Sequence, residues 1–278
     1  MRTICAVALD LLREAASRKW FLGLAIAITL GLGVFGFSLK LEVVDGALAA
    51  SRLFGEVLHN DIRAVDVALR PLLQAAAYLI FYVGLVFGII ATADFAPSLL
   101  SPGRIEHLLA QPVRRSELLV GTFLGVLVLA LLASLYGAAG LTVMLGVKAR
   151  LWTWGPILAA LIASVCFASI YAAMITAALF ARSAAVSAGV GFALFVGGIF
   201  AGNRAEVAGM LEEGFGRGAF LAVTLALPRL SALATASANL SASMPLEIRS
   251  LWGLLGGVFV FGLGVLALGI YRFEQKDF

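Results

Sequence analysis

The chain has 278 residues, of which 62% are hydrophobic and only 13% charged, and its formal net charge at pH 7 is +4. Soluble globular domains are about 25% charged, so this composition excludes an ordinary water-soluble domain and predicts a multi-span membrane protein. The basic residues are scattered over separate segments, which excludes a nucleic-acid-binding patch, and the two distant cysteines, Cys5 and Cys166, predict neither a disulfide framework nor a thiolate metal site.

Residues 1–19 are predicted to form an amphipathic helix that lies at the membrane surface. Ile4, Val7 and Leu11 fall on one helical face, whereas Asp10 and Arg13 fall on the other. An unstructured leader is the alternative. The apolar run that follows is longer than the about 7–15 residues of a signal-peptide core, so we expect it to be a retained span.

Six apolar runs are long enough to cross a membrane as a helix, which takes about 20 residues. They are residues 20–39, 72–92, 118–146, 155–180, 184–202 and 251–271. None carries a charged residue or a histidine in its interior, and none alternates polar and apolar residues as a barrel strand would. We therefore predict an all-α integral membrane protein with six transmembrane helices, built as a single domain over residues 1–278.

An even number of spans places both termini on the same side of the membrane. Basic residues abut the span ends on that side at Arg18, Lys19, Arg114, Arg115 and Arg272. The charge bias next to span ends therefore predicts that both termini are cytoplasmic. Of the two long external loops, residues 41–71 are expected to be partly helical. The other, residues 203–250, contains an apolar run that Pro228 cuts short, which predicts a re-entrant or interfacial segment before the last span.

The sequence contains no recognisable catalytic or metal-binding constellation. The stretch "GLGVFG" matches a dinucleotide-binding pattern but lies inside a predicted span, and the chain has no Walker lysine loop. His59 and His107 fall on opposite sides of the membrane in the predicted topology, so they cannot share a metal ion. Spans without ionisable residues also argue against an ion-driven carrier. An intramembrane enzyme acting on lipids is an alternative that lacks the necessary polar groups.

Small and aromatic residues within the spans indicate where helices pack and where a cargo could bind. Gly84–Gly88, Gly121–Gly125 and Gly253–Gly257 have the spacing that lets helices approach closely in lipid. Aromatic residues gather in the second and fifth spans. The candidate substrate-path residues among them are Tyr78, Phe81, Tyr82, Phe192 and Phe195. Such surfaces suit an apolar or amphipathic cargo, although ordinary helix packing is the commoner reason for them.

A charged stretch between the second and third spans has the pattern of a short helix, a turn and a new helix. Ser101 and Pro102 are typical of a helix start, and Pro112 ends the segment. Ser116 is expected to cap the next helix, with Glu117 near its positive end. Because no chemistry is arranged there, the stretch predicts a site for a protein partner.

The residues "GRIEHLLAQPVRRSELLVGTFLG" resemble the first cytoplasmic loop of type-2 ABC exporter permeases, and the tail "YRFEQKDF" is similar to the end of those proteins. The positions that match the pattern of the loop are Gly103, Glu106, Leu108, Leu109, Pro112, Arg115, Glu117 and Gly121, whereas Thr122 replaces the usual lysine. The resemblance implies that an ATPase docks on this loop, at Gly103, Arg104, Ile105, Glu106, Leu108, Leu109, Pro112, Arg115 and Glu117.

The resemblance further implies a non-enzymatic permease subunit in a bacterial-type inner membrane. This chain would hold no cofactor, because ATP and Mg would be bound by a separate ABC ATPase subunit. A second permease copy, membrane lipids and a periplasmic protein are the other expected partners. Residues 1–19 would be the interfacial helix, 93–117 the coupling loop and 203–250 the external loop. A membrane component of an envelope assembly or force-transmitting complex is the alternative function.

Overall fold

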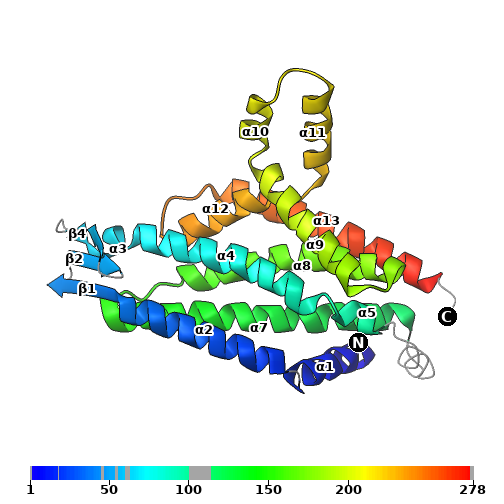
Figure 1. The fold of residues 1–278 in the computed structure, drawn as a ribbon, viewed down its shortest axis with the longest axis horizontal. Helices are drawn as coiled ribbons and strands as arrows, with labels where there is room; N and C mark the ends of the chain where they lie inside the picture. The colour runs from blue at the N-terminus through cyan, green and yellow to red at the C-terminus, as the bar shows by residue number, and fades with distance from the viewer. Residues whose placement is uncertain are drawn as a thin grey trace.

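The computed structural model describes residues 2–17, 19–44, 47–53, 56–59, 63–99 and 114–275. Its elements in chain order are α1 (Arg2–Ser17), α2 (Lys19–Ser38), β1 (Leu39–Val44), β2 (Ala47–Leu53), β3 (Glu56–His59), β4 (Arg63–Ala64), α3 (Val65–Ala68), α4 (Arg70–Thr92), α5 (Phe95–Leu99), α7 (Arg115–Ala149), α8 (Gly155–Ala181), α9 (Ala184–Gly202), α10 (Arg204–Met210), α11 (Phe215–Ala226), α12 (Leu230–Ser241) and α13 (Ile248–Glu274). The long helices lie side by side in an elongated bundle (Figure 1).

The long apolar helices confirm the predicted helical membrane architecture. Within the described residues, five segments are long and apolar enough to cross a membrane: α4 continued by α5, and α7, α8, α9 and α13. They coincide with five of the six predicted runs. The remaining run, residues 20–39, is α2, which is bent by 67° against α1. A second bent pair, α11 with α12 at 56°, raises the number of candidate spans to as many as seven.

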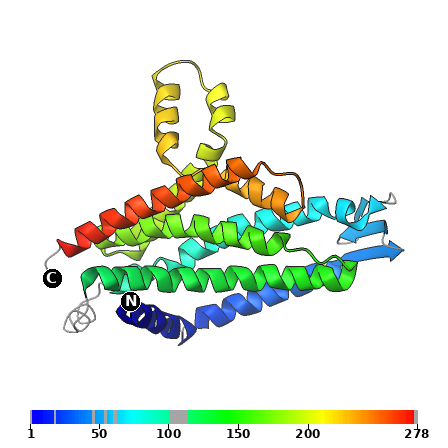
Figure 2. The same ribbon diagram turned by 180° about the vertical axis from the view of Figure 1, so that it is seen from behind.

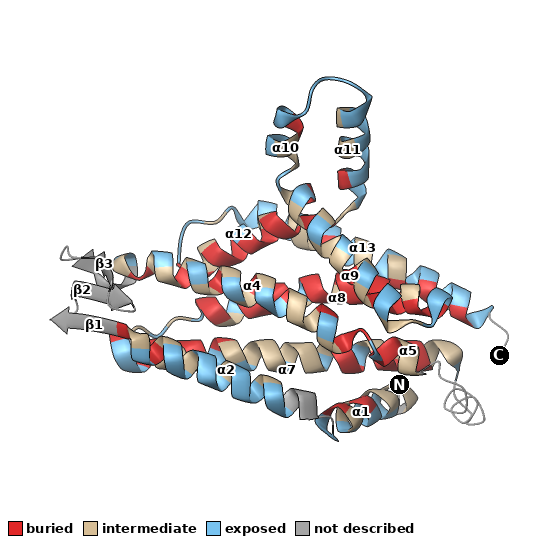
Figure 3. Cartoon of the chain, viewed as in Figure 1, coloured by how far each residue is buried: buried red, intermediate tan, exposed pale blue. Residues whose placement is uncertain are grey.

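Helix α8 lies at the centre of the bundle. Of its most apolar 18-residue window 67% is buried inside the protein, compared with 22% for α9 and for α13, and Figure 3 shows the difference. The Thr176 hydroxyl of α8 donates a hydrogen bond to the carbonyl of Val265 on α13, at 3.1 Å. Close packing of α8 with its neighbours follows from its many small residues, since small side chains let backbones approach in lipid.

A small antiparallel sheet follows α2, in the segment that we expected to be partly helical. Strand β2 is central, because it pairs with β1, β3 and β4. The register of the first pair places Leu39 opposite Leu53. The structure thus adds a β element to the helical bundle, at the end opposite to the termini (Figure 1).

The start of α1 and the end of α13 lie at the same end of the bundle (Figures 1 and 2). Figures 1 and 2 show α1, α5, the start of α7 and the end of α13 together there, and the strands at the far end. The Arg115 guanidinium lies 3.5 Å from the carbonyl oxygen of Glu274, which joins the start of α7 to the end of α13. The Arg272 guanidinium lies 5.9 Å from the ring centre of Phe180, at the end of α8.

Residues 203–250 form a hairpin followed by a helix that returns to the bundle. Helices α10 and α11 project from the side of the bundle as a pair (Figures 1 and 2). Helix α12 then packs against α4, α8 and α9, and Leu230 and Leu233 at its start are fully buried. The bend between α11 and α12 is the geometry of a broken or re-entrant segment, the kind that the sequence predicted before the last span.

Candidate functional site

Most of the predicted coupling residues lie outside the described residues. These are Gly103, Arg104, Ile105, Glu106, Leu108, Leu109 and Pro112, whereas Arg115 and Glu117 are described. The structure does describe the segments on both sides of this loop, α5 before it and the first turn of α7 after it. Their contacts define how the loop is attached to the bundle.

Helix α5 is attached to the bundle by buried apolar side chains. Phe95 and Ala96 are only 3% and 2% exposed and belong to the main hydrophobic core. The backbone N–H of Ser98 donates to the carbonyl of Asp94 at 2.9 Å, and its hydroxyl donates to the carbonyl of Phe95 at 3.0 Å. The chain therefore leaves the second long helix through a short, fixed turn of helix before it enters the loop.

The first turn of α7 is attached by polar contacts. This helix begins at Arg115, so the expected capping residue Ser116 lies inside the first turn. The Glu117 carboxylate accepts a hydrogen bond from the backbone N–H of Arg114 at 3.3 Å, which satisfies a donor at the helix start. Its negative charge is also favourable near the positive end of the helix dipole. Arg115 contacts the end of α13, as described above.

Helix α1 packs against α7 through the predicted Gly121–Gly125 pair. A Cβ atom on Gly121 would lie 2.7 Å from the Cβ of Val7, and one on Gly125 would lie 3.1 Å from the carbonyl oxygen of Ala8. Such distances leave no room for a side chain, so only glycine permits this approach. Leu11 of α1 is buried at 7% exposure. The sequence identified the small face of α7, but only the structure identifies α1 as its partner.

The predicted substrate-path residues form a cluster between α4 and α9. The rings of Tyr78 and Tyr82 are stacked at 6.2 Å, and Tyr82 meets Phe195 edge-on at 6.1 Å. Tyr78, Tyr82, Phe192 and Phe195 are partly buried and pack against the main core. Phe81 is fully buried between helices, so its ring reaches no free surface.

Polar contacts that the sequence did not predict join α12 to the two helices of this cluster. The Gln74 amide donates to the side-chain carbonyl of Asn239 at 3.1 Å, and the Tyr78 hydroxyl donates to Thr235 at 3.3 Å. The Ser231 hydroxyl lies 2.9 Å from the carbonyl of Ile199 on α9. Isolated polar residues in apolar helices could have indicated that such contacts exist. The sequence does not show which residues pair, because the partners lie far apart along the chain. In the described part of the chain, no three His, Cys, Asp or Glu residues are grouped to hold a metal ion.

Comparison with known families gives a match over almost the whole chain. The sequence model of a family described as "ABC-2 family transporter protein" matches residues 6–278. No curated protein matches the chain. The matched range includes the loop region, all the long helices and the α10–α12 segment.

Proposed function

The chain belongs to the ABC-2 transporter family and is a multi-pass membrane permease; from this premise we propose that it serves an ATP-driven exporter whose ATP is hydrolysed by a separate subunit. Permeases of this family are generally non-enzymatic transport components. ATP and Mg would therefore belong to the partner, and this chain would convert the partner's movement into a movement of its helices.

The loop of residues 101–113 is the proposed docking point for the ATPase. The observation that supports this most is the attachment of its two flanks, since α5 is held by buried Phe95 and the start of α7 is held by α1 and α13. Because both flanks are fixed, a displacement of the loop would be transmitted to α5 and α7. Basic residues next to the span ends at this end of the bundle support a cytoplasmic position.

Replacing Leu108 and Leu109 together by Ser tests the docking proposal. The co-expressed ATPase and this chain would be purified and reconstituted, and transport-coupled ATP hydrolysis and co-purification would be measured. Burial of each leucine is worth about 1.5–3 kcal/mol at most, so the double variant should lose one or both. Ile248→Ser, which changes an exposed apolar residue at the start of α13, is the matched control. Normal coupling in the double variant would show that the ATPase docks elsewhere.

We further propose that the cargo is apolar or amphipathic and passes the aromatic cluster between α4 and α9. Charged groups are absent from the interiors of these spans, so nothing there replaces the hydration shell of an ion. The partly buried rings of Tyr82 and Phe195 offer apolar contact area with little demand for polar geometry. A second copy of the chain, related by symmetry, would bring two such clusters together.

ATPase stimulation in proteoliposomes tests the nature of the cargo. Lipids or hydrophobic compounds should stimulate hydrolysis, and Phe195→Ala should reduce the stimulation. Phe259→Ala, which changes an exposed phenylalanine on α13, should leave it unchanged. Stimulation by a hydrophilic ion alone would contradict the proposal. Stimulation only by a folded periplasmic protein would instead favour the role in envelope assembly.

A further inference from the structure

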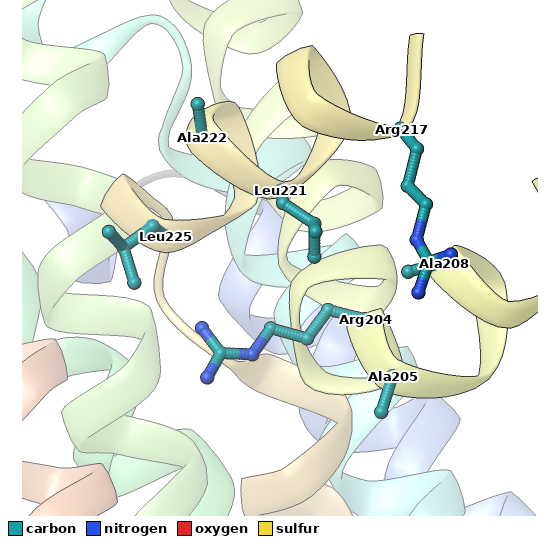
Figure 4. Close-up of a pocket in the computed structure, with 7 residues that line it drawn as sticks. All are labelled: Arg204, Ala205, Ala208, Arg217, Leu221, Ala222 and Leu225. Carbon is teal, nitrogen blue, oxygen red and sulfur yellow. The ribbon is translucent and has the colours of Figure 1, made fainter. Parts of the chain in front are cut away.

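The α10–α11 hairpin forms an open groove that none of the proposed transport steps uses. The two helices stand side by side away from the bundle (Figures 1 and 2) and line a cavity of about 590 Å³. Figure 4 shows Arg204 of α10 extending across one end of the groove towards Leu225, and Arg217 of α11 extending at the other end towards Ala208. Leu221 and small residues line the space between them.

The groove carries uncompensated positive charge. Arg217 has a carboxylate partner, because its guanidinium lies 3.4 Å from Glu213, although the Glu213 side chain is 93% exposed. In the described part of the chain, no carboxylate lies within ion-pair distance of Arg204, which is partly buried. Glu206 and Glu212, the other carboxylates of the hairpin, are exposed. Arg204 is therefore a guanidinium at an apolar wall, without a counter-charge.

The hairpin that forms the groove has a polar part and an apolar part. The tip of the hairpin, around Glu212 and Glu213, is polar, whereas α11 becomes apolar towards its end and continues into the buried start of α12. Val223 and Leu225 are 63% and 70% exposed on this apolar part. Val223 thus offers an exposed apolar side chain beside a groove that Leu225 and the two arginines line. This arrangement suits contact with lipid chains and with an anion.

We propose that this groove binds an anionic phospholipid, with the phosphate held by Arg204 and the start of an acyl chain along Leu221 and Leu225. A planar guanidinium donates two parallel hydrogen bonds to a phosphate and is favoured over other side chains for this contact. The cavity volume lies within the range of ligand sites, about 300–1,000 Å³, and accommodates a headgroup with part of a chain. The proposal does not rest on transport, because neither the ATPase nor a cargo enters it.

Fluorescence quenching in nanodiscs tests this site. The full chain, with Cys5→Ser to remove the exposed thiol, would carry a bimane label at Ala226→Cys, an exposed position next to Leu225. The discs would consist of phosphatidylcholine with a small, fixed fraction of spin-labelled phosphatidylglycerol or of spin-labelled phosphatidylcholine. Phosphatidylglycerol should quench the label more strongly at the same fraction.

Variants then assign the preference to Arg204. Arg204→Gln should reduce the preference for phosphatidylglycerol about tenfold, the factor that corresponds to about 1.4 kcal/mol of binding free energy. Arg204→Lys keeps the charge and should retain part of the preference, which separates loss of the site from misfolding. Arg249→Gln, which removes an exposed arginine from α13, should change nothing. Equal quenching by both lipids, or an unchanged preference in Arg204→Gln, would overturn the assignment to lipid.

Discussion

The substitution Gly121→Ala should destabilise the protein, although alanine is the better helix former. The new Cβ atom would lie 2.7 Å from the Cβ of Val7 and 3.1 Å from the carbonyl oxygen of Ile4. Overpacking of this kind costs about 1–3 kcal/mol. If α1 moves away instead, burial of Leu11 is lost, which costs about 1.5–3 kcal/mol at most. Both routes therefore lower the free energy of unfolding by a similar amount.

Gly137→Ala on the same helix is the matched control. Its Cβ atom would lie 3.7 Å from a methyl group of Ile28, an ordinary contact. Both variants gain the same intrinsic helix preference of about 0.5–1 kcal/mol, so this contribution cancels in the comparison. The free energy of unfolding, measured by SDS titration in mixed micelles, should be lower for Gly121→Ala than for Gly137→Ala by about 1–3 kcal/mol.

A double-mutant cycle identifies the contact responsible. Val7→Gly removes both side-chain atoms nearest to the added methyl group, so the combined variant should recover part of the stability beyond the sum of the single changes. Equal stability of Gly121→Ala and Gly137→Ala would refute the reasoning, because it would mean that α1 does not pack on α7. Additive effects of the two changes would likewise place the clash somewhere other than at Val7.

Three further predictions concern topology and interhelical contacts. An impermeant thiol reagent applied from outside should label Glu212→Cys but not Lys276→Cys, and the reverse pattern would invert the proposed orientation. Thr176→Val removes the hydrogen bond to α13 and should lower the free energy of unfolding by about 0.6 kcal/mol. Thr142→Val, which removes a hydroxyl that donates to the carbonyl of Ala138 in its own helix, should cost less. Lys148→Met removes an ammonium group that donates to the carbonyl of Gly36, near the end of α2, and to the carbonyl of Leu39 at 2.9 Å. The loss costs about 1.5–3 kcal/mol and should speed amide hydrogen exchange at the end of α2; unchanged exchange would contradict a capping role.

The coupling residues show how far the sequence could define the candidate site. The pattern around Glu106, Leu108 and Leu109 led to the family through a resemblance, and the family match over residues 6–278 confirms that part. The role of the loop stays a prediction, because residues 101–113 lie outside the described part of the chain. The attachment of its flanks could not be predicted, since Arg115 contacts Glu274, a residue far away in sequence.

The sequence alone determined the class of the protein and the extent of its long helices. A span requires about 20 apolar residues and no unpaired charge, and both properties can be recognised from consecutive residues of the sequence. Five of the six predicted runs became α4, α7, α8, α9 and α13, with the sixth in the bent α1–α2 pair. The apolar stretch before Pro228 likewise predicted a re-entrant or interfacial segment, and it corresponds to the bent pair of α11 and α12.

The arrangement of the helices was decided by the tertiary structure. A side chain that faces lipid and one that faces a neighbouring helix are both apolar, so the periodicity that reveals the buried face of a soluble helix is weak here. Three glycine pairs had the same spacing, yet Gly121–Gly125 packs against α1, whereas Gly253–Gly257 has no described atom within 4 Å of either Cβ position. Which small face meets a partner depends on the complementary shape of another helix, which lies elsewhere in the chain.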